Sequence, residues 1–257
     1  MGVGIQLHDV DTVVECRLLI AHPTRPRVLA VRRAGAWALP ALTPLEQHVA
    51  AVSHINLAAF RLFGLRTHVR RLILERSEDP GYHSILRIYE LEAIGELAGQ
   101  RIERTVWAGS DVLGEMDFKP GPDRDIITTW LDNYVADEPE ISGPPWSRRG
   151  WFEAASAWMQ RQASASGVKV RGIPDQHWTS DDINVLALAS EDGMILMTAS
   201  LGPVSGGPAS GSPERIESSE WASRLGWTNL DLIASDPTRN WSLYRTGSAS
   251  THNPALR

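Results

Sequence analysis

The sequence predicts an α+β fold in two domains, and three observations support this prediction. The chain has 257 residues, which is enough for two hydrophobic cores. Short β-branched stretches alternate with amphipathic helical stretches in both halves. Between the halves, residues 136–149 are first acidic and then proline-rich and basic, as is typical of a linker. We therefore expect domains over residues 1–135 and 150–245, with a disordered tail over 246–257.

The composition is that of an ordinary globular protein, with 42% hydrophobic and 22% charged residues. The formal net charge of −6 gives no reason to expect binding to nucleic acid or to an anionic membrane. Cys16 is the one cysteine, so no intrachain disulfide can form and a cytoplasmic location is expected. We expect neither a signal peptide nor a membrane span, because no apolar stretch has the required length or flanks.

In the first half, alternating β-branched residues and turn signals predict the order of the elements. A helix over 123–135 follows the turn Pro120-Gly121-Pro122 and presents apolar residues on one side. The expected strands cover residues 12–21, 27–33, 68–75, 84–93 and 104–108.

A long helix is predicted over residues 43–65. Thr43 is a common capping residue, Pro44 suits the first helical position, and Glu46 completes a capping box. Gly64 can adopt the left-handed conformation that ends a helix. Apolar residues cover much of the circumference, so we expect this helix to be packed between other layers.

The second half combines one helix with short strands. An amphipathic helix is expected over 151–162, and a second over 214–225. Glu191-Asp192-Gly193 is a hairpin signal between two strands. The predicted strands cover residues 168–173, 183–189, 194–199, 231–234 and 241–244.

The first half resembles a Nudix domain over roughly residues 10–135. The resemblance rests on the order of a strand, RVLAVRR, WALP, a long helix ending in Gly-Leu, further strands and a late helix. It implies an α/β/α sandwich with a mixed sheet. Hydrolytic members carry the pattern Gly-x5-Glu-x7-Arg-Glu-hydrophobic-x-Glu-Glu-x-Gly-hydrophobic, whose glutamates hold a divalent metal against a pyrophosphate.

The glutamates of this pattern are missing from the chain. With the closing Gly-hydrophobic pair on residues 64–65, the first glutamate falls on Val49 and the second on Ala58. The Glu-Glu pair falls on Arg61 and Leu62. Because Mg²⁺ needs oxygen ligands, we expect no metal, no other cofactor and no catalytic residue of the hydrolytic kind.

Two interpretations of the long helix stay open. It is purely structural, with Arg61 paired or solvated, or Arg61 contacts a polar or anionic ligand directly, with Arg33 and His54 nearby. Trp37 could be a stacking surface for a flat ligand, and His83 an acid–base group. The candidate ligand-binding residues are Arg33, Trp37, His54, Arg61, Glu75 and His83.

The second half resembles the small, β-rich lobe of aminoglycoside-phosphotransferase-like, kinase-like proteins. The resemblance rests on PPWSRRGWFEAASAWM, followed by a tryptophan and the strand pair 183–189 and 194–199. It implies a smaller antiparallel domain. Thr198 lies near the position of the family's phosphate-binding lysine and cannot supply that cation, so we expect no phosphotransfer.

These observations favour a non-catalytic binding protein, built from a degenerate Nudix-like domain and a truncated kinase-like small lobe. Its partner would be a small polar or anionic ligand, another protein, or a second copy bound through the second half, since a small lobe without its companion exposes an apolar face. The alternative is a metal-independent enzyme of small-molecule metabolism, of the isomerase or cyclase type, that uses the Nudix pocket. Nudix pyrophosphohydrolysis is a third function, if the register on the helix differs.

Overall fold

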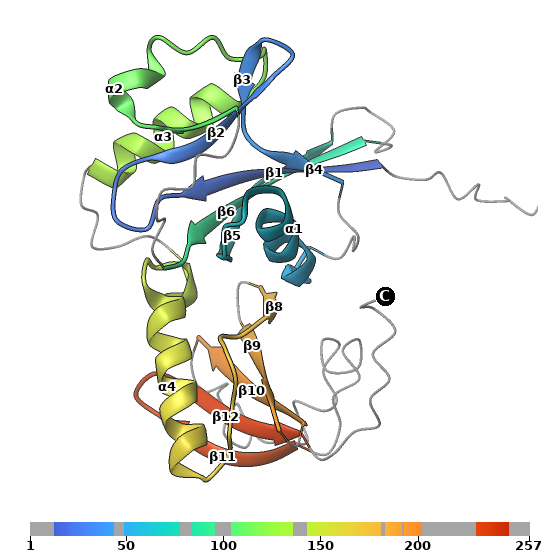
Figure 1. Cartoon of the computed structure of the whole chain (residues 1–257), viewed down its shortest axis with the longest axis vertical. Coiled ribbons are helices and arrows are strands. Elements are labelled where there is room, and N and C mark those ends of the chain that lie inside the picture. The colour runs from blue at the N-terminus through green and yellow to red at the C-terminus, as the bar shows by residue number, and fades with distance from the viewer. Residues whose placement is uncertain are drawn as a thin grey trace, which may run out of the picture. The chain divides into compact units, whose positions relative to one another are not determined.

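The computed structural model describes residues 13–43, 49–77, 84–95, 104–135, 143–180, 183–191, 193–201 and 230–246. The chain divides into two compact units. The first comprises Met1–Gln47 with Ala58–Glu138, and the second comprises His48–Leu57 with Pro139–Arg257. Both units combine helices with a sheet, so the α+β class is confirmed (Figure 1).

The first unit is built on a mixed seven-stranded sheet with the order β3-β2-β1-β6-β5, in which β4 pairs with β1 and β7 with β2. β1 and β6 run parallel, and the other pairs are antiparallel. The predicted mixed sheet is thereby confirmed. The strands are β1 (Val13–Ala21), β2 (Val28–Arg33), β3 (Ala36–Ala38), β4 (Ala41–Leu42), β5 (Thr67–Ser77), β6 (Ser84–Ala93) and β7 (Thr105–Ala108).

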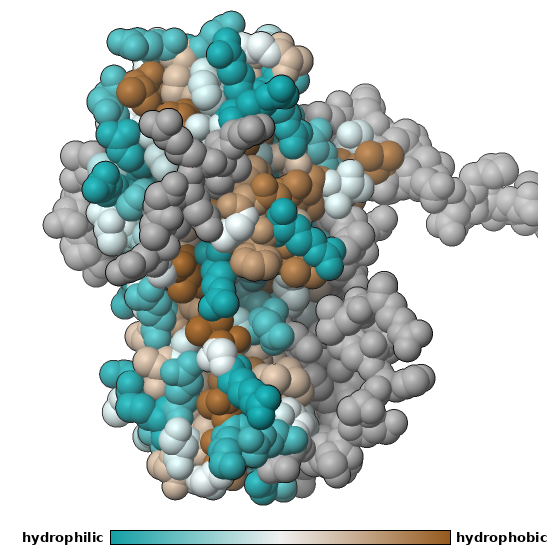
Figure 2. Space-filling model, viewed as in Figure 1, coloured by the Kyte–Doolittle hydropathy of each residue, from teal (hydrophilic) through white to brown (hydrophobic). Residues whose placement is uncertain are grey.

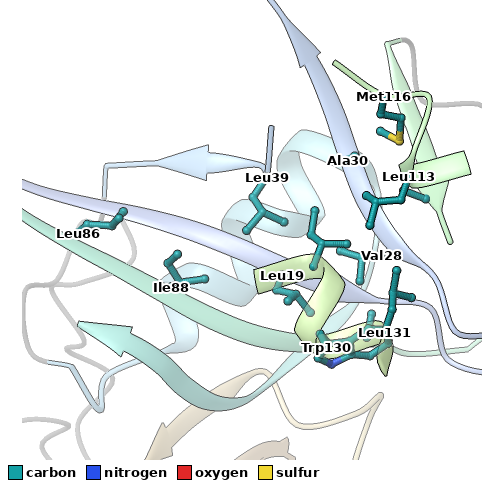
Figure 3. Close-up of a cluster of buried hydrophobic side chains, with 13 residues drawn as sticks. Leu19, Val28, Ala30, Leu39, Leu86, Ile88, Leu113, Met116, Trp130 and Leu131 are labelled. Atoms are coloured by element: carbon teal, nitrogen blue, oxygen red, sulfur yellow. The ribbon is translucent and has the colours of Figure 1, made fainter. Parts of the chain in front are cut away.

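One face of this sheet is covered by α2 (Ser110–Leu113) and α3 (Asp123–Val135) (Figure 1). The bounds of α3 match the predicted late helix. Figure 3 shows Leu19 and Val28 of the sheet close to Trp130 and Leu131 of α3. Successive side chains of β1 and β6 point to opposite faces of the sheet, and most of both sets are buried. One set of each strand therefore points to this helix. The resulting core fixes the positions of the polar side chains described below.

The predicted helix over 43–65 is shorter than expected, since α1 covers Ser53–Phe63. Gly64 adopts a φ of 65° and ends it as predicted. At the other end, Ala51 forms a bridge with Trp178 and is therefore extended. An extended residue cannot be helical, so the predicted start is wrong; Pro44 and Glu46 of the predicted capping box lie outside the described residues.

The second unit contains an antiparallel five-stranded sheet with the order β11-β12-β10-β9-β8. The predicted strand over 168–173 is wrong, because the strand that precedes the β9–β10 hairpin is β8 and only Val170 forms an isolated bridge. The predicted helix over 214–225 lies outside the described residues. The strands are β8 (Gln176–Thr179), β9 (Ile183–Ser190), β10 (Gly193–Ser200), β11 (Leu230–Asp236) and β12 (Trp241–Thr246).

Helix α4 (Trp151–Ala165) is joined to this sheet by buried tryptophans (Figure 1). The ring of Trp241 on β12 lies edge-on to Trp151 and Trp158 of α4, with centroids 6.0 and 5.5 Å apart. Trp146, in the short 3₁₀ turn Pro145–Ser147, donates its indole N–H to the Ser180 carbonyl at 3.0 Å. These tryptophans are therefore core residues of the second unit.

The placement of residues 48–57 differs from the predicted division, whose tail over 247–257 lies outside the described residues. Residues 48–57 are grouped with the second unit, although the chain on either side of them belongs to the first. The boundary between the units therefore falls inside α1, and residues 136–149 are not the one place where the chain passes from one unit to the other.

Candidate functional site

The end of α1 is the part of the chain on which the Nudix register was placed. Gly64 ends the helix and Leu65 is buried, as the closing Gly-hydrophobic pair requires. Arg61 lies in the last turn and is exposed to solvent. Ala58 and Leu62, at two of the glutamate positions, carry no group that can coordinate a metal ion.

Polar residues form a row across three strands of the first sheet. Cys16 on β1 pairs in register with Arg87 on β6, and Arg87 pairs with Glu75 on β5. Arg87 donates from Nε to the Glu75 carboxylate at 2.6 Å and also hydrogen-bonds the neighbouring Tyr89. Glu75, one of the candidate residues, therefore lies at the more exposed end of a polar row that continues into the core.

The buried end of this row is chemically inert at neutral pH. Burial raises the pKa of the Cys16 thiol to about 11, although the nearby Arg87 charge opposes the shift. Burial likewise raises the pKa of Tyr89, against the effect of Arg87. Both groups stay protonated, so neither is an activated nucleophile or a general base.

Arg33 and Trp37 lie on the hairpin formed by β2 and β3. Arg33 is exposed and donates to the Ala41 carbonyl at 3.1 Å. Trp37 is half-buried against the core under α3, and its main chain bonds to Asp117 and Lys119. The Trp37 ring is approached by the Arg32 guanidinium at 5.9 Å, so its immediate cationic neighbour is Arg32.

Of the two candidate histidines, the structure describes only His54. His54 lies in the first turn of α1, is half-buried, and is grouped with the second unit, whereas Arg61 on the same helix is grouped with the first. His83 lies outside the described residues. The suggested proximity of His54, Arg33 and Arg61 stays a prediction.

A buried charge network around Glu90 was not predicted. Its carboxylate accepts hydrogen bonds from Arg70, from Arg71 at 2.7 Å and from the Trp130 indole at 2.9 Å, and the Glu90 side chain is 1% exposed. The network ties α3 to β5 and β6. The sequence could have indicated that Glu90 is buried. Glu90 follows Leu86 by four residues on β6, so both side chains point to the same face of the sheet and into the same core.

Asp123 forms a second buried anchor, at the start of α3. Its carboxylate accepts a hydrogen bond from the Leu39 main-chain N–H at 2.8 Å and pairs with the Arg17 guanidinium at 2.6 Å. Across the described residues, no group of three His, Cys, Asp or Glu side chains is arranged to hold a metal ion. The helices of the described part are each too short or too polar to cross a bilayer.

Comparison with known proteins gave structural matches only. No family model matches the chain, and no curated protein matches it in sequence. A protein of Sinorhizobium meliloti 1021 named as a candidate oxidoreductase is similar over 50% of this chain, with 15% identity and a TM-score of 0.39. The match spans 42% of that protein's length.

Nudix hydrolases are also among the similar solved structures. The enzyme from Nitrosomonas europaea matches 50% of this chain and 75% of its own, with 16% identity and a TM-score of 0.38. The enzyme from M. smegmatis matches 50% of this chain and 90% of its own, with 22% identity and a TM-score of 0.36.

Proposed function

We propose that this chain is a non-catalytic binding protein whose first unit is a Nudix-like domain without the metal-binding glutamates. The observation that carries the proposal is the composition of α1: its eleven residues include no aspartate or glutamate, and Arg61 is exposed at one of the metal positions. A guanidinium there repels a divalent cation and attracts an anion.

In the described part of the first unit, three carboxylates that could stand in for the missing glutamates are already paired with arginines. Glu75 is bound to Arg87, Glu90 to Arg70 and Arg71, and Asp123 to Arg17. A carboxylate that already neutralises an arginine is a poor ligand for Mg²⁺, because binding the metal would break the ion pair. These pairings support binding without a metal.

The ligand of the first unit is a small polar or anionic molecule, bound with the help of Arg61 and Arg33. Both guanidinium groups are exposed, and neither is in an ion pair within the described residues. The alternative, a metal-independent isomerase or cyclase, would depend on His54, His83, Glu75 or Arg61. Cys16 and Tyr89 stay protonated in the core, which leaves that alternative without an activated group in the polar row.

For the second unit we propose a kinase-like small lobe that does not transfer phosphate. The strands assigned to that lobe, β9, β10, β11 and β12, belong to one antiparallel sheet, and Thr198 on β10 is buried. A buried hydroxyl cannot bind nucleotide phosphates as a lysine does. We also propose, from the sequence resemblance alone, that the second unit provides the contact in a homodimer. On the face shown in Figure 2, hydrophobic residues are scattered among hydrophilic ones, so that face does not supply the contact.

Two measurements test the first-unit proposal. Incubation with Mg²⁺ and a panel of nucleoside diphosphate compounds should release no phosphate or nucleotide product. A thermal-shift screen of anionic metabolites, with and without Mg²⁺, should give stabilisation that does not depend on the metal. The hit should bind Arg61→Ala about tenfold more weakly, the cost of one charge-assisted hydrogen bond.

The matched control is Arg161→Ala, which removes another exposed arginine from the surface of α4. It should leave the affinity unchanged. Magnesium-dependent turnover of any compound in the panel would overturn the proposal, and equal effects of the two arginine variants would remove Arg61 from the binding site.

A further inference from the structure

A short segment from the first half of the sequence pairs with the edge of β8 that faces away from β9. The Thr179 N–H donates to the Ala50 carbonyl at 3.0 Å, and the Val52 N–H donates to the His177 carbonyl at 3.3 Å. Between these bonds, Ala51 lies opposite Trp178 in antiparallel register. This alternation is the hydrogen-bond pattern of a strand added to a sheet edge.

The Ser53 side chain adds two contacts at the same edge residue. Its hydroxyl accepts the His177 N–H at 2.7 Å and donates to the His177 carbonyl at 3.1 Å. One side chain therefore satisfies both main-chain groups that His177 presents at this edge. A residue without a short hydroxyl could not do so, which makes the position selective for serine or threonine.

The segment also contributes to the core of the second unit. Ala50 is buried in a cluster with Trp178 and residues of β9, β10, β11 and β12. A larger side chain would have to displace Trp178 or the sheet residues beneath it. The edge thus favours an extended segment with a small apolar residue, followed three positions later by a hydroxyl.

We propose that the β8 edge is a strand-addition site whose resident occupant is this chain's own Ala50–Ser53, here called the strap. The strap sets where α1 begins. The Val52 carbonyl accepts the first helical N–H groups, those of Ile55 and Asn56, at 3.0 and 3.2 Å. Since Ala51 is held extended against β8, the helix cannot grow past Val52 towards Thr43. This inference is independent of the function proposed for the first unit.

The strap accounts for the grouping of residues 48–57 with the second unit, although the neighbouring sequence belongs to the first. It also covers main-chain groups of a sheet edge that would otherwise be a template for pairing with other chains. Removing the strap should therefore expose an edge that binds an extended peptide, while the rest of the sheet is kept by its own ladder.

The test uses full-length protein and two variants of the strap. Val52→Pro removes the N–H that bonds His177 and suits the extended Ala51 before it. Because the Val52 side chain is buried, a second variant that keeps it is needed. Ser53→Ala removes both hydroxyl contacts. Amide exchange should be faster in β8 of each variant by about tenfold, the effect of losing roughly one hydrogen bond, and unchanged in β10 and β12. Ser164→Ala, an exposed serine on α4, is the matched control and should change nothing.

A fluorescently labelled peptide of residues 47–57 then probes the edge directly. It should bind Val52→Pro and restore the protection of β8, and bind the wild type at least tenfold more weakly because the site is filled. Unchanged exchange in both variants would overturn the proposal, and so would equal peptide binding to wild type and variant. Protection of β8 that appears only in a concentration-dependent dimer would also overturn it, because the occupant would then be a second copy's strap.

Discussion

The two helices α1 and α3 begin for different physical reasons. The start of α3 is marked locally by Pro120-Gly121-Pro122, and Asp123 at its first position is locked by the Leu39 N–H and by Arg17. The start of α1 is set by main-chain pairing of Ala50–Val52 with a strand more than 120 residues later. Local sequence signals predict a helix start well where the residues make no other main-chain pairing. They fail where the same residues pair with a distant strand.

The largest expected effect concerns the charged anchor of α3. Glu90→Ala removes the carboxylate that neutralises the buried Arg70 and that accepts the Trp130 N–H. We expect a loss of about 3–5 kcal/mol in the free energy of unfolding of the first unit, the usual cost of breaking a buried ion pair. Urea denaturation followed by circular dichroism would measure it. Glu15→Ala, at a half-exposed ion pair with Arg17, should cost less than about 1 kcal/mol.

Asp123→Ala removes the side chain that holds the start of α3 in place. This change leaves the buried Leu39 N–H without its acceptor and Arg17 without its buried partner. The expected loss is about 2–3 kcal/mol, below that of Glu90→Ala. The same denaturation experiment ranks the two variants, and the reverse order would mean that α3 depends more on its first turn than on the Glu90 network.

Acid should destabilise the second unit before it destabilises the first. Burial lowers the pKa of His177 on β8 from 6.5 to about 3, against the effect of its hydrogen bond to Asn184. The unfolded chain therefore takes up a proton below about pH 6.5 that the folded unit excludes. The contribution of neutral His177 is complete above that pH and declines below it, by about 2 kcal/mol at pH 5.

Glu90 responds in a lower pH range. Burial alone would raise its pKa, but Arg70 and Arg71 bring it below the ordinary value of 4.5. Its contribution is complete above about pH 4.5 and is lost only as the pH falls further. At pH 5, amide exchange should thus accelerate in β8 before it does in β6. His177→Gln should abolish the change between pH 7 and pH 5, and simultaneous loss of protection in both strands would contradict the assignment.

The smallest effect is expected at the predicted start of α1. Thr43→Ala removes the predicted capping side chain, but α1 begins ten positions later at Ser53. We expect a change below about 0.5 kcal/mol in the free energy of unfolding, as for an ordinary exposed residue. A loss of about 1 kcal/mol or more, typical of an N-cap, would show that Thr43 does cap a helix.

Much of the fold was predictable, because its signals are local. The bounds of α3 and β6 match the prediction, and the Ser190–Gly193 hairpin joins β9 and β10 as expected. The strap was not predictable, because Ala50–Ser53 fits a helical pattern and its partner β8 lies in the other half of the sequence. The expected strand over 168–173 was misplaced for a similar reason: β8 has polar residues at both ends and His177 between them, and its place in the sheet depends on pairing with β9.

The candidate site was predictable in its chemistry more than in its geometry. The absence of carboxylates from α1 follows directly from the sequence. The partners of the individual residues do not: Glu75 is held by Arg87, and the ring of Trp37 is next to Arg32. Pairings of this kind depend on strand register, which one sequence does not fix.

Calorimetric titration of the full-length protein with Mn²⁺ tests whether the first unit binds without a metal. The same titration is made on the variant Ala58→Glu/Arg61→Glu/Leu62→Glu. This variant returns carboxylates to three metal positions of the Nudix pattern. We expect no saturable binding by the wild type and detectable binding by the variant. Saturable Mn²⁺ binding by the wild type, accompanied by turnover of a nucleoside diphosphate compound, would contradict this expectation.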